Sequence, residues 1–228
     1  MTAEFKLARI YYKGKGVPQD YAEAVRWYRK AADRGYAQAQ GAFGFMYYEG
    51  KGVPQDYAEA ARWYRKASDQ GYAKAQFGLA SMYYDGKGVS QDYAEAARWY
   101  RKAAEQGDAL AQDGIGFMYY QGKGVPQDYA EAVRWYRKAA DQGYAKAQYD
   151  LGYMYSHGKG VPQDYAEAAR WYRKAADQGH ENAQRALGSM RMGLTTWSKI
   201  NLSLAFLGSI LLLISSRGSI RDRSEQQP

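Results

Sequence analysis

Few side chains in this sequence could support catalysis. Its 228 residues include two histidines and no cysteine, so a cysteine nucleophile and a thiolate metal site are excluded. His157 lies beside Ser156, and His180 replaces the tyrosine found at equivalent turns. Catalysis requires a nucleophile, a base and an orienting group, or a cluster of metal ligands, whereas isolated surface histidines are usually just solvated. We therefore predict no enzymatic activity, no bound metal and no cofactor.

A lysine flanked by glycines occurs five times, in the string GKGVPQ or GKGVSQ, and suggests a phosphate-binding loop. The string lacks the spacing GxxxxGK[ST] that such a loop requires. Gly50 and Gly52 permit positive φ angles, and Pro54 lies two residues before Asp56, which can cap a helix. These features are typical of a turn, so we predict a connector between two helices.

The elements that must position these residues recur with a fixed period. The string DYAEAVRWYRKA begins at Asp20 and returns nearly unchanged every 36 residues. A repeat of this length is typical of a solenoid, in which each unit buries its apolar face against its neighbours. The segment from Ala183 to Met190 repeats the first half of the unit once more. We predict an all-α, right-handed superhelical solenoid of antiparallel helix pairs with five and a half units, covering residues 1–192.

Within one unit, the pattern predicts a first helix over 37–48 and a second over 57–70. Asp56 and Glu59 are spaced as a variant capping box at the start of the second helix. Gly71 is a typical residue just beyond a helix end. The apolar stripe of this helix is expected to contain Ala58, Ala60, Trp63, Tyr64 and Ala67, with Trp63 as the principal core aromatic residue of its unit.

The repeated motif, AQxxLGxMYxxGKGVxQDYxEAxxWYRKAAxxG, resembles the Sel-1-like repeat, a relative of the tetratricopeptide repeat, over roughly residues 3–192. The resemblance implies a curved superhelix that acts as an adaptor in protein complexes, and the near-identical copies resemble bacterial members. Some cysteine-rich relatives carry disulfides and have been linked to β-lactam hydrolysis. Because this chain has no cysteine, nothing carries over from them.

Positions on the first helix that differ between units share one helical face. Counted from Gln38, these positions have offsets of 0, 3, 4, 7 and 11 residues, which fall within an arc of roughly 100° around the helix axis. We expect this variable face to be exposed on the concave surface and to bind a protein or peptide, since large aromatic residues are costly when merely exposed. The alternative explanation is that these positions vary between units because nothing selects their residues. The predicted groove residues are Gln38, Gly41, Phe45, Lys74, Phe77, Ser81, Leu110, Asp113, Phe117, Lys146, Tyr149 and Tyr153.

The second helix offers a different hypothesis. Arg62, Arg65 and Lys66 recur in every unit, and the chain has a formal net charge of +8. A basic ladder on the convex face could bind nucleic acid or another anionic polymer. Glu59 lies three residues before Arg62, which favours local ion pairs instead. We keep polyanion binding as the alternative function and consider it the weaker one.

The composition changes after Met192. Residues 193–199 form an expected linker, 200–216 carry no charge, and 217–228 form a basic polar tail. We predict that 200–216 is a transmembrane or tail-anchor helix that holds the solenoid at the cytoplasmic side of an inner membrane. The alternatives are a helix that caps the solenoid or contacts a second copy, a disordered segment or a frame error, and a soluble cytoplasmic protein. The orientation, the partner and the oligomeric state stay open.

The N-terminus also falls within the repeat. Subtracting the period from first-helix residues places Met1 inside a unit, and no apolar run typical of a secretory signal is present. The sequence therefore leaves open whether an upstream portion is missing.

Overall fold

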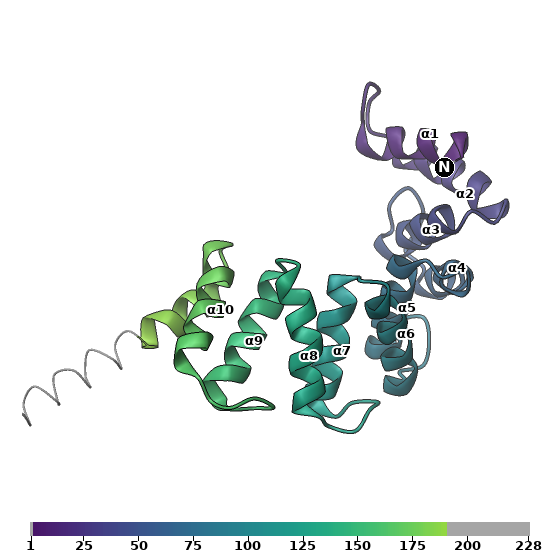
Figure 1. The fold of residues 1–228 in the computed structure, drawn as a ribbon. Helices are drawn as coiled ribbons and strands as arrows, with labels where there is room; N and C mark the ends of the chain where they lie inside the picture. Colours follow the sequence, from purple (N-terminus) through teal and green to yellow (C-terminus); the bar gives the residue numbers. More distant parts are fainter. Residues whose placement is uncertain (1, 191–228) are drawn as a thin grey trace, which may run out of the picture.

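The computed structural model describes residues 2–190, and throughout this range the regular secondary structure is helical. Ten helices form five antiparallel pairs, and residues 181–190 form one further helix (Figure 1). This confirms the predicted all-α fold of stacked helix pairs. The helices are α1 (Ala3–Lys13), α2 (Tyr21–Asp33), α3 (Ala37–Glu49), α4 (Tyr57–Asp69), α5 (Ala73–Asp85), α6 (Tyr93–Glu105), α7 (Ala109–Gln121), α8 (Tyr129–Asp141), α9 (Ala145–His157) and α10 (Tyr165–Asp177).

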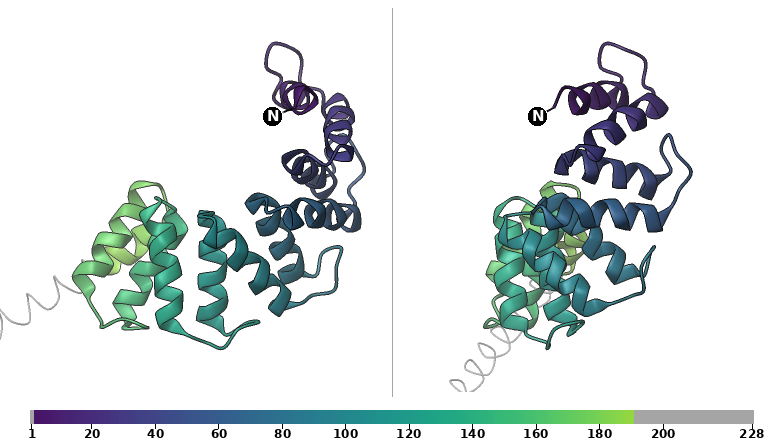
Figure 2. Two further views of the ribbon diagram at one scale, coloured as in Figure 1. Left: turned by 45° about the vertical axis from the view of Figure 1, so that its right-hand side comes forward. Right: turned by 90° about the vertical axis from the view of Figure 1, so that its right-hand side faces the viewer.

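The stack is an arc in which each helix packs against the next one in the chain. The odd-numbered helices lie toward the inside of the arc and the even-numbered helices toward the outside, most plainly for α1 to α4 (Figure 2). The same surface of each odd-numbered helix is therefore presented along the inside. This arrangement places the variable positions of successive units in one row.

The ends of the second helices follow the predicted turn chemistry with one difference. At α4, the Asp56 carboxylate accepts a hydrogen bond from the Glu59 amide at 3.0 Å. The return bond of a capping box is absent there, because the Glu59 side chain pairs with Arg62 and the Asp56 amide donates to the Tyr47 carbonyl. Gly71 has a φ of 85° just beyond the helix end, as predicted.

The core of α4 differs from the prediction. Trp63 is only half-buried, and Tyr64, which is 8% exposed, is the buried aromatic residue of α4. Its ring lies against Gly44 of α3 and Gly78 of α5, where a side chain would crowd it. The prediction for Trp63 itself was therefore wrong, although the equivalent Trp99, Trp135 and Trp171 are buried beside their tyrosines.

The predicted apolar stripe was also wrong at one position. Ala58 is exposed, whereas Ala61 and Ser68 are buried together with Ala60 and Ala67. The buried arc is rotated toward Ala61 because α4 contacts the first helices of two units, α3 and α5, at once. A pattern within one helix cannot reveal a second neighbour.

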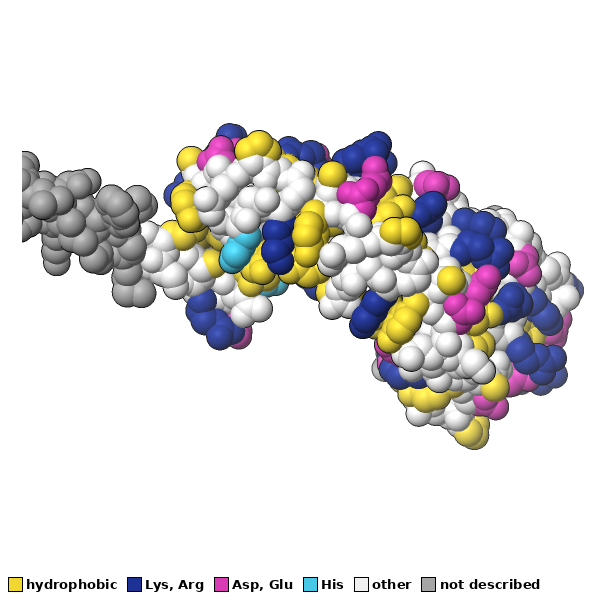
Figure 3. All heavy atoms as spheres, turned by 90° about the horizontal axis from the view of Figure 1, so that it is seen from below, with side chains coloured by type: hydrophobic (Ala, Val, Ile, Leu, Met, Phe, Trp, Pro, Cys, Tyr) yellow, Lys and Arg dark blue, Asp and Glu magenta, His cyan; other side chains and the backbone are white. Residues whose placement is uncertain are grey.

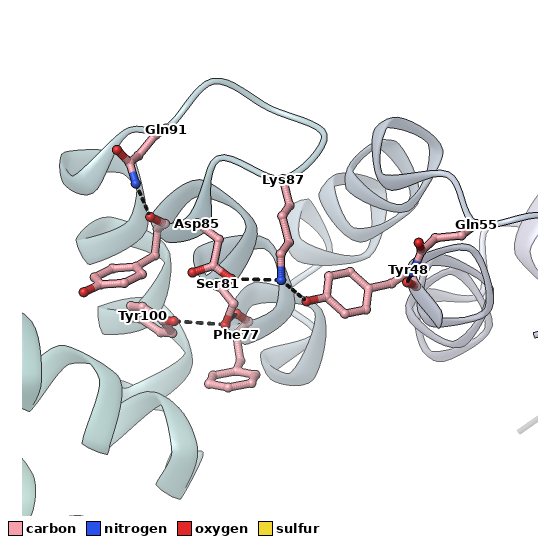
Figure 4. Close-up of polar contacts among 9 residues, drawn as sticks. Tyr48, Gln55, Phe77, Ser81, Asp85, Lys87, Gln91 and Tyr100 are labelled. Carbon is pink, nitrogen blue, oxygen red and sulfur yellow. Dashed lines mark hydrogen bonds and ion pairs between the residues drawn. The ribbon is translucent and has the colours of Figure 1, made fainter. Parts of the chain in front are cut away.

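The connectors join each unit to the preceding one. Lys87 donates from Nζ to the Tyr48 hydroxyl at 3.2 Å, across 39 residues of sequence (Figure 4). The equivalent bonds of Lys123 and Lys159 measure 3.0 and 2.8 Å. Seen from below, where the later connectors lie, basic side chains lie beside hydrophobic ones (Figure 3). The repeated lysine therefore has a structural role between units.

The second glycine of the connector is required by the same junction. Gly88 has a φ of 68°, and an added Cβ would collide with the Tyr57 carbonyl oxygen of the preceding unit. Gly124 relates to Tyr93 in the same way. Only glycine satisfies both the backbone angle and the close approach.

A buried glutamine ladder forms a second junction. The Gln76 amide donates to the Ser68 carbonyl at 3.2 Å and accepts a bond from Gln106 at 2.7 Å. The arrangement recurs at each following unit, so these buried amides have partners on both sides. The invariant glutamine of the motif thus fixes the spacing between successive units.

Candidate binding groove

Three neighbouring cavities lie along the odd-numbered helices. Cavity 1 has a volume of about 450 Å³ and is lined mainly by α1, α3 and α5. Cavity 2, of about 260 Å³, lies between α5, α7 and α9, and cavity 3, of about 190 Å³, lies between α7 and α9. Phe77 is shared by cavities 1 and 2, and Phe117 by cavities 2 and 3. We call this row the groove.

All twelve predicted residues line the groove. Cavity 1 contains Gln38, Gly41, Phe45, Lys74, Phe77 and Ser81. Cavity 2 contains Phe77, Leu110, Asp113, Phe117 and Lys146, and cavity 3 contains Phe117, Tyr149 and Tyr153. The structure therefore brings together residues from four units of sequence. Their role in binding stays a prediction.

The variable face is less exposed than predicted. Gln38, Lys74, Lys146 and Leu110 are exposed, Leu110 by 44%. Gly41 and Asp113 are buried, and the remaining six residues, Phe45, Phe77, Ser81, Phe117, Tyr149 and Tyr153, are half-buried. The prediction of an exposed face was wrong at these positions because the inside of the arc draws neighbouring units together.

The burial of Gly41 shows how this happens. The ring of Tyr72, from the turn before α5, lies where a Cβ of Gly41 would be. Similarly, Phe77 packs against Tyr100 at 5.7 Å between ring centroids, and Phe117 packs against Tyr84 at 6.4 Å. The aromatic side chains form the walls between cavities. They are thus fixed in place by the rings of other helices.

Recurring tyrosines also line the groove, although they were not among the predicted site residues. Tyr48, Tyr64 and Tyr72 line cavity 1, and Tyr100 and Tyr144 line cavity 2. Of these, only Tyr64 was considered, as part of the apolar stripe of the second helix. A tyrosine carries a hydroxyl that needs a polar partner or an open space, and this was the available signal.

The hydroxyl of Tyr100 is held inside the groove. It lies 2.9 Å from the Ser81 Oγ, which also donates to the Phe77 carbonyl at 3.1 Å (Figure 4). Burial raises the pKa of Tyr100 to about 12, although the bond to Ser81 opposes this. The hydroxyl is therefore neutral and available as a donor and acceptor near neutral pH.

Asp113 and Lys146 of cavity 2 form a charged cluster with Asp150, which lines the adjoining cavity 3. Lys146 donates from Nζ to Asp113 Oδ2 and to Asp150 Oδ2, both at 2.8 Å. Burial raises the pKa of Asp113 to about 6, although the charge of Lys146 opposes this shift. Burial lowers the pKa of Lys146, but the two carboxylates outweigh it and raise that pKa overall. Asp150 was not among the predicted residues, although its position four residues after Lys146 indicated a pair.

The basic residues of the outer helices have partners within the chain. Arg62 pairs with Glu59 at 2.9 Å, as the spacing predicted, and Arg65 contacts the Tyr83 hydroxyl. Lys66 lies over the Trp63 ring at 4.1 Å from its centroid. These contacts account for the repetition of the three residues without an anionic ligand. Polyanion binding stays an untested alternative.

The histidines lie beside the groove and pack on its aromatic rings. His157 stacks on Tyr153 with 4.0 Å between ring centroids, and His180 stacks on Tyr149 at 4.8 Å. The Ser156 Oγ lies 2.7 Å from His157 Nδ1 and 3.1 Å from the Tyr172 hydroxyl. Across residues 2–190, no group of three or more His, Asp or Glu side chains is placed to hold a metal ion.

The predicted membrane segment, residues 200–216, lies outside the described residues. Within residues 2–190, no helix combines the length and the apolar character needed to cross a membrane.

Comparisons with known proteins give a consistent result. The family model of the Sel1 repeat matches residues 2–36, 37–72, 73–108, 109–144 and 145–180. A protective antigen of uropathogenic Escherichia coli with an SLR fold is 44% identical with a TM-score of 0.80, over 84% of this chain and 41% of the antigen. This chain therefore spans about two fifths of that relative's length.

Two further solved structures are similar. A Sel1 repeat protein from Oxalobacter formigenes is 39% identical, with a TM-score of 0.76 over 81% of this chain and 74% of its own. An immunity protein from Pseudomonas aeruginosa is 25% identical, with a TM-score of 0.53 over 80% of this chain and 69% of its own. None of the curated proteins compared with the chain matches it.

Proposed function

Because the chain belongs to the Sel1 repeat family, whose members generally serve as scaffolds for protein interaction, we propose that it binds a protein or peptide in the groove and has no catalytic role. The names of its structural relatives point to no single partner. The proposal therefore concerns the surface used and the kind of ligand.

One observation supports this proposal above the others. Variation between nearly identical units is concentrated on residues that line three adjoining cavities. Elsewhere the repeated residues make the same contacts from unit to unit, as the connector lysines and the glutamine ladder do. Large half-buried aromatic side chains around open cavities are typical of surfaces that bind proteins.

The test removes the walls that adjoining cavities share. A double variant, Phe77→Ala with Phe117→Ala, opens all three cavities and should weaken binding of a partner at least about tenfold. The partner would be captured by the full chain, identified by mass spectrometry and titrated in purified form. Unchanged affinity in the double variant would refute groove binding.

The matched control truncates an aromatic residue on the outer helices. Trp27 is half-buried like Phe77, and its ring packs under Lys30 at 4.2 Å rather than in the groove. Trp27→Ala should reduce stability while leaving partner affinity unchanged. Circular dichroism would show that all variants retain their helices, with a lower melting temperature expected because these rings are partly buried.

We also propose that residues 200–216 tether the solenoid to a membrane, with the solenoid in the cytoplasm. Support comes from their uncharged sequence and the basic residues on both sides. Cells expressing the full chain would be fractionated beside cells expressing a version that ends at Met192. The tether is refuted if both versions are recovered in the soluble fraction.

A further inference from the structure

The charged cluster formed by Asp113 and Lys146 of cavity 2 with Asp150 of cavity 3 leaves one negative charge without a balancing group. Two carboxylates, Asp113 and Asp150, share the single ammonium group of Lys146. Asp113 is 7% exposed, and its Oδ1 is buried with no hydrogen-bond partner among the described residues. Burying a charged oxygen without a partner is unfavourable, so its presence requires an explanation.

The fold itself does not require this cluster. The position of Asp113 is occupied by Gly41, Phe77 and Tyr149 in other units, and the position of Asp150 by Ala42, Gly78 and Gly114. The same helices therefore stack without either carboxylate. Buried ion pairs contribute little to stability compared with apolar residues of similar volume. A structural role explains these two acidic residues poorly.

Aromatic rings form the rest of the cavity wall. Phe77, Tyr84, Tyr100, Phe117 and Tyr144 all line cavity 2. The faces of such rings attract cations, and Lys146 already lies 5.7 Å from the centroid of Phe117. A second positive group entering this cavity would therefore meet both unbalanced negative charge and aromatic faces.

We propose that cavity 2 is a subsite for a basic side chain, lysine or arginine, of the protein or peptide that occupies the groove. This inference rests on the proposed function and adds the chemistry of the ligand. The cavity of about 260 Å³ admits one side chain rather than a folded element. An acidic side chain would be repelled by the carboxylates. A metal ion is disfavoured because Lys146 occupies the space between the two acids.

The test uses small probes that need no protein partner. The isotope-labelled full chain would be titrated with N-acetyl-arginine methylamide and, separately, with N-acetyl-citrulline methylamide, which has the same shape without the charge. Binding would be measured from the NMR shifts of Leu110, Asp113 and Lys146. The arginine probe should bind at least about tenfold more tightly than the citrulline probe. Equal binding of the two probes, or no binding of either, overturns the subsite.

Two variants separate the cluster from general surface charge. Asp113→Asn should remove the preference for the arginine probe, and its fold is expected to persist because other units carry uncharged residues there. Asp141→Asn, which changes an exposed carboxylate at the end of α8, should preserve the preference. A preference that survives Asp113→Asn also overturns the proposal.

Failure of this inference can be distinguished from failure of the proposed function. If a partner binds the groove but the probes do not discriminate, only the subsite is withdrawn. If the arginine probe binds cavity 2 but loss of Phe77 and Phe117 leaves partner binding intact, the groove is not where the partner binds.

Discussion

The connectors and the groove use the same first helices in opposite ways. At the connectors, three lysines bind the tyrosine hydroxyl of the preceding unit at 3.2, 3.0 and 2.8 Å. In the groove, one repeat position holds Gly41, Phe77, Asp113 and Tyr149 in turn. A junction must fit an identical neighbour, so its residues are restricted. A surface beside an open cavity is less restricted by an identical neighbour, so its residues can differ from unit to unit.

The largest expected effect breaks a connector junction. Gly124→Ala places a Cβ against the Tyr93 carbonyl oxygen at a positive φ of 68°, and should destabilise the chain by about 3–5 kcal/mol. Gly143→Ala is the matched control, because its φ of 89° is also positive but nothing lies within 4 Å. It should cost only about 1–2 kcal/mol. Urea unfolding followed by circular dichroism measures both, and equal losses would contradict the role of crowding.

A smaller loss is expected in the glutamine ladder. Gln112 is buried, donates to the Ala104 carbonyl at 3.1 Å and accepts a bond from Gln142 at 2.8 Å. Gln112→Ala should cost about 2–3 kcal/mol because it leaves polar groups unpaired and opens a cavity. Gln184 is an exposed copy with one long bond of 3.4 Å, so Gln184→Ala should cost less than about 0.5 kcal/mol. Similar unfolding midpoints for the two variants would show that the ladder is dispensable.

In the groove, the substitution Asp113→Asn is expected to increase the stability of the folded chain, by an amount that depends on pH. Burial raises the pKa of Asp113 from 3.8 to about 6, so the folded chain binds the proton more tightly than the unfolded chain. Stability from this group is therefore fully present below pH 3.8 and is lost as the pH rises to about 6. Asp113→Asn should match the original chain near pH 4 and be more stable by on the order of 2 kcal/mol at pH 7.

The pH experiment compares thermal unfolding of both chains from pH 4 to pH 7. The titratable groups near Asp113 are Lys146, Asp150, Tyr100, Tyr136 and Tyr144, and none of them is altered. A variant that is less stable at pH 7 would show that the pairing with Lys146 outweighs the burial of the carboxylate.

The smallest effect concerns the outer face. Arg62 is exposed and pairs with Glu59 three residues earlier, so Arg62→Ala should change the unfolding free energy by less than about 0.5 kcal/mol. It should also leave partner affinity unchanged. Loss of binding in this variant, with a strong dependence on salt, would favour the polyanion alternative over the groove.

Much of the fold could be predicted from the period alone. The spacing of Asp56, Gly71 and the connector glycines placed the helix ends to within one residue, because caps and turns depend on residues close in sequence. The choice of Trp63 over Tyr64 as the buried aromatic residue failed for the opposite reason. Burial of Tyr64 depends on glycines in two other helices, one of them in the next unit.

The residues that line the candidate site could be predicted from the sequence, but their burial and their contacts could not. Comparison of units identified the twelve variable residues that line the groove, because residues beside open cavities are less constrained by the stacking of units. It did not reveal that Asp113 is buried or that Asp150 joins it through Lys146. Asp113 and Lys146 are 33 residues apart, and their distance follows from how α7 and α9 pack.

The sequence by itself determined the family, the helical repeat and the face on which the units differ, because each follows from local spacing repeated many times. Only the tertiary structure decided which of those residues are buried, where the cavities lie and which charges meet. Those outcomes depend on contacts between side chains a full repeat apart. The solenoid's curvature sets such contacts, and no single unit contains that information.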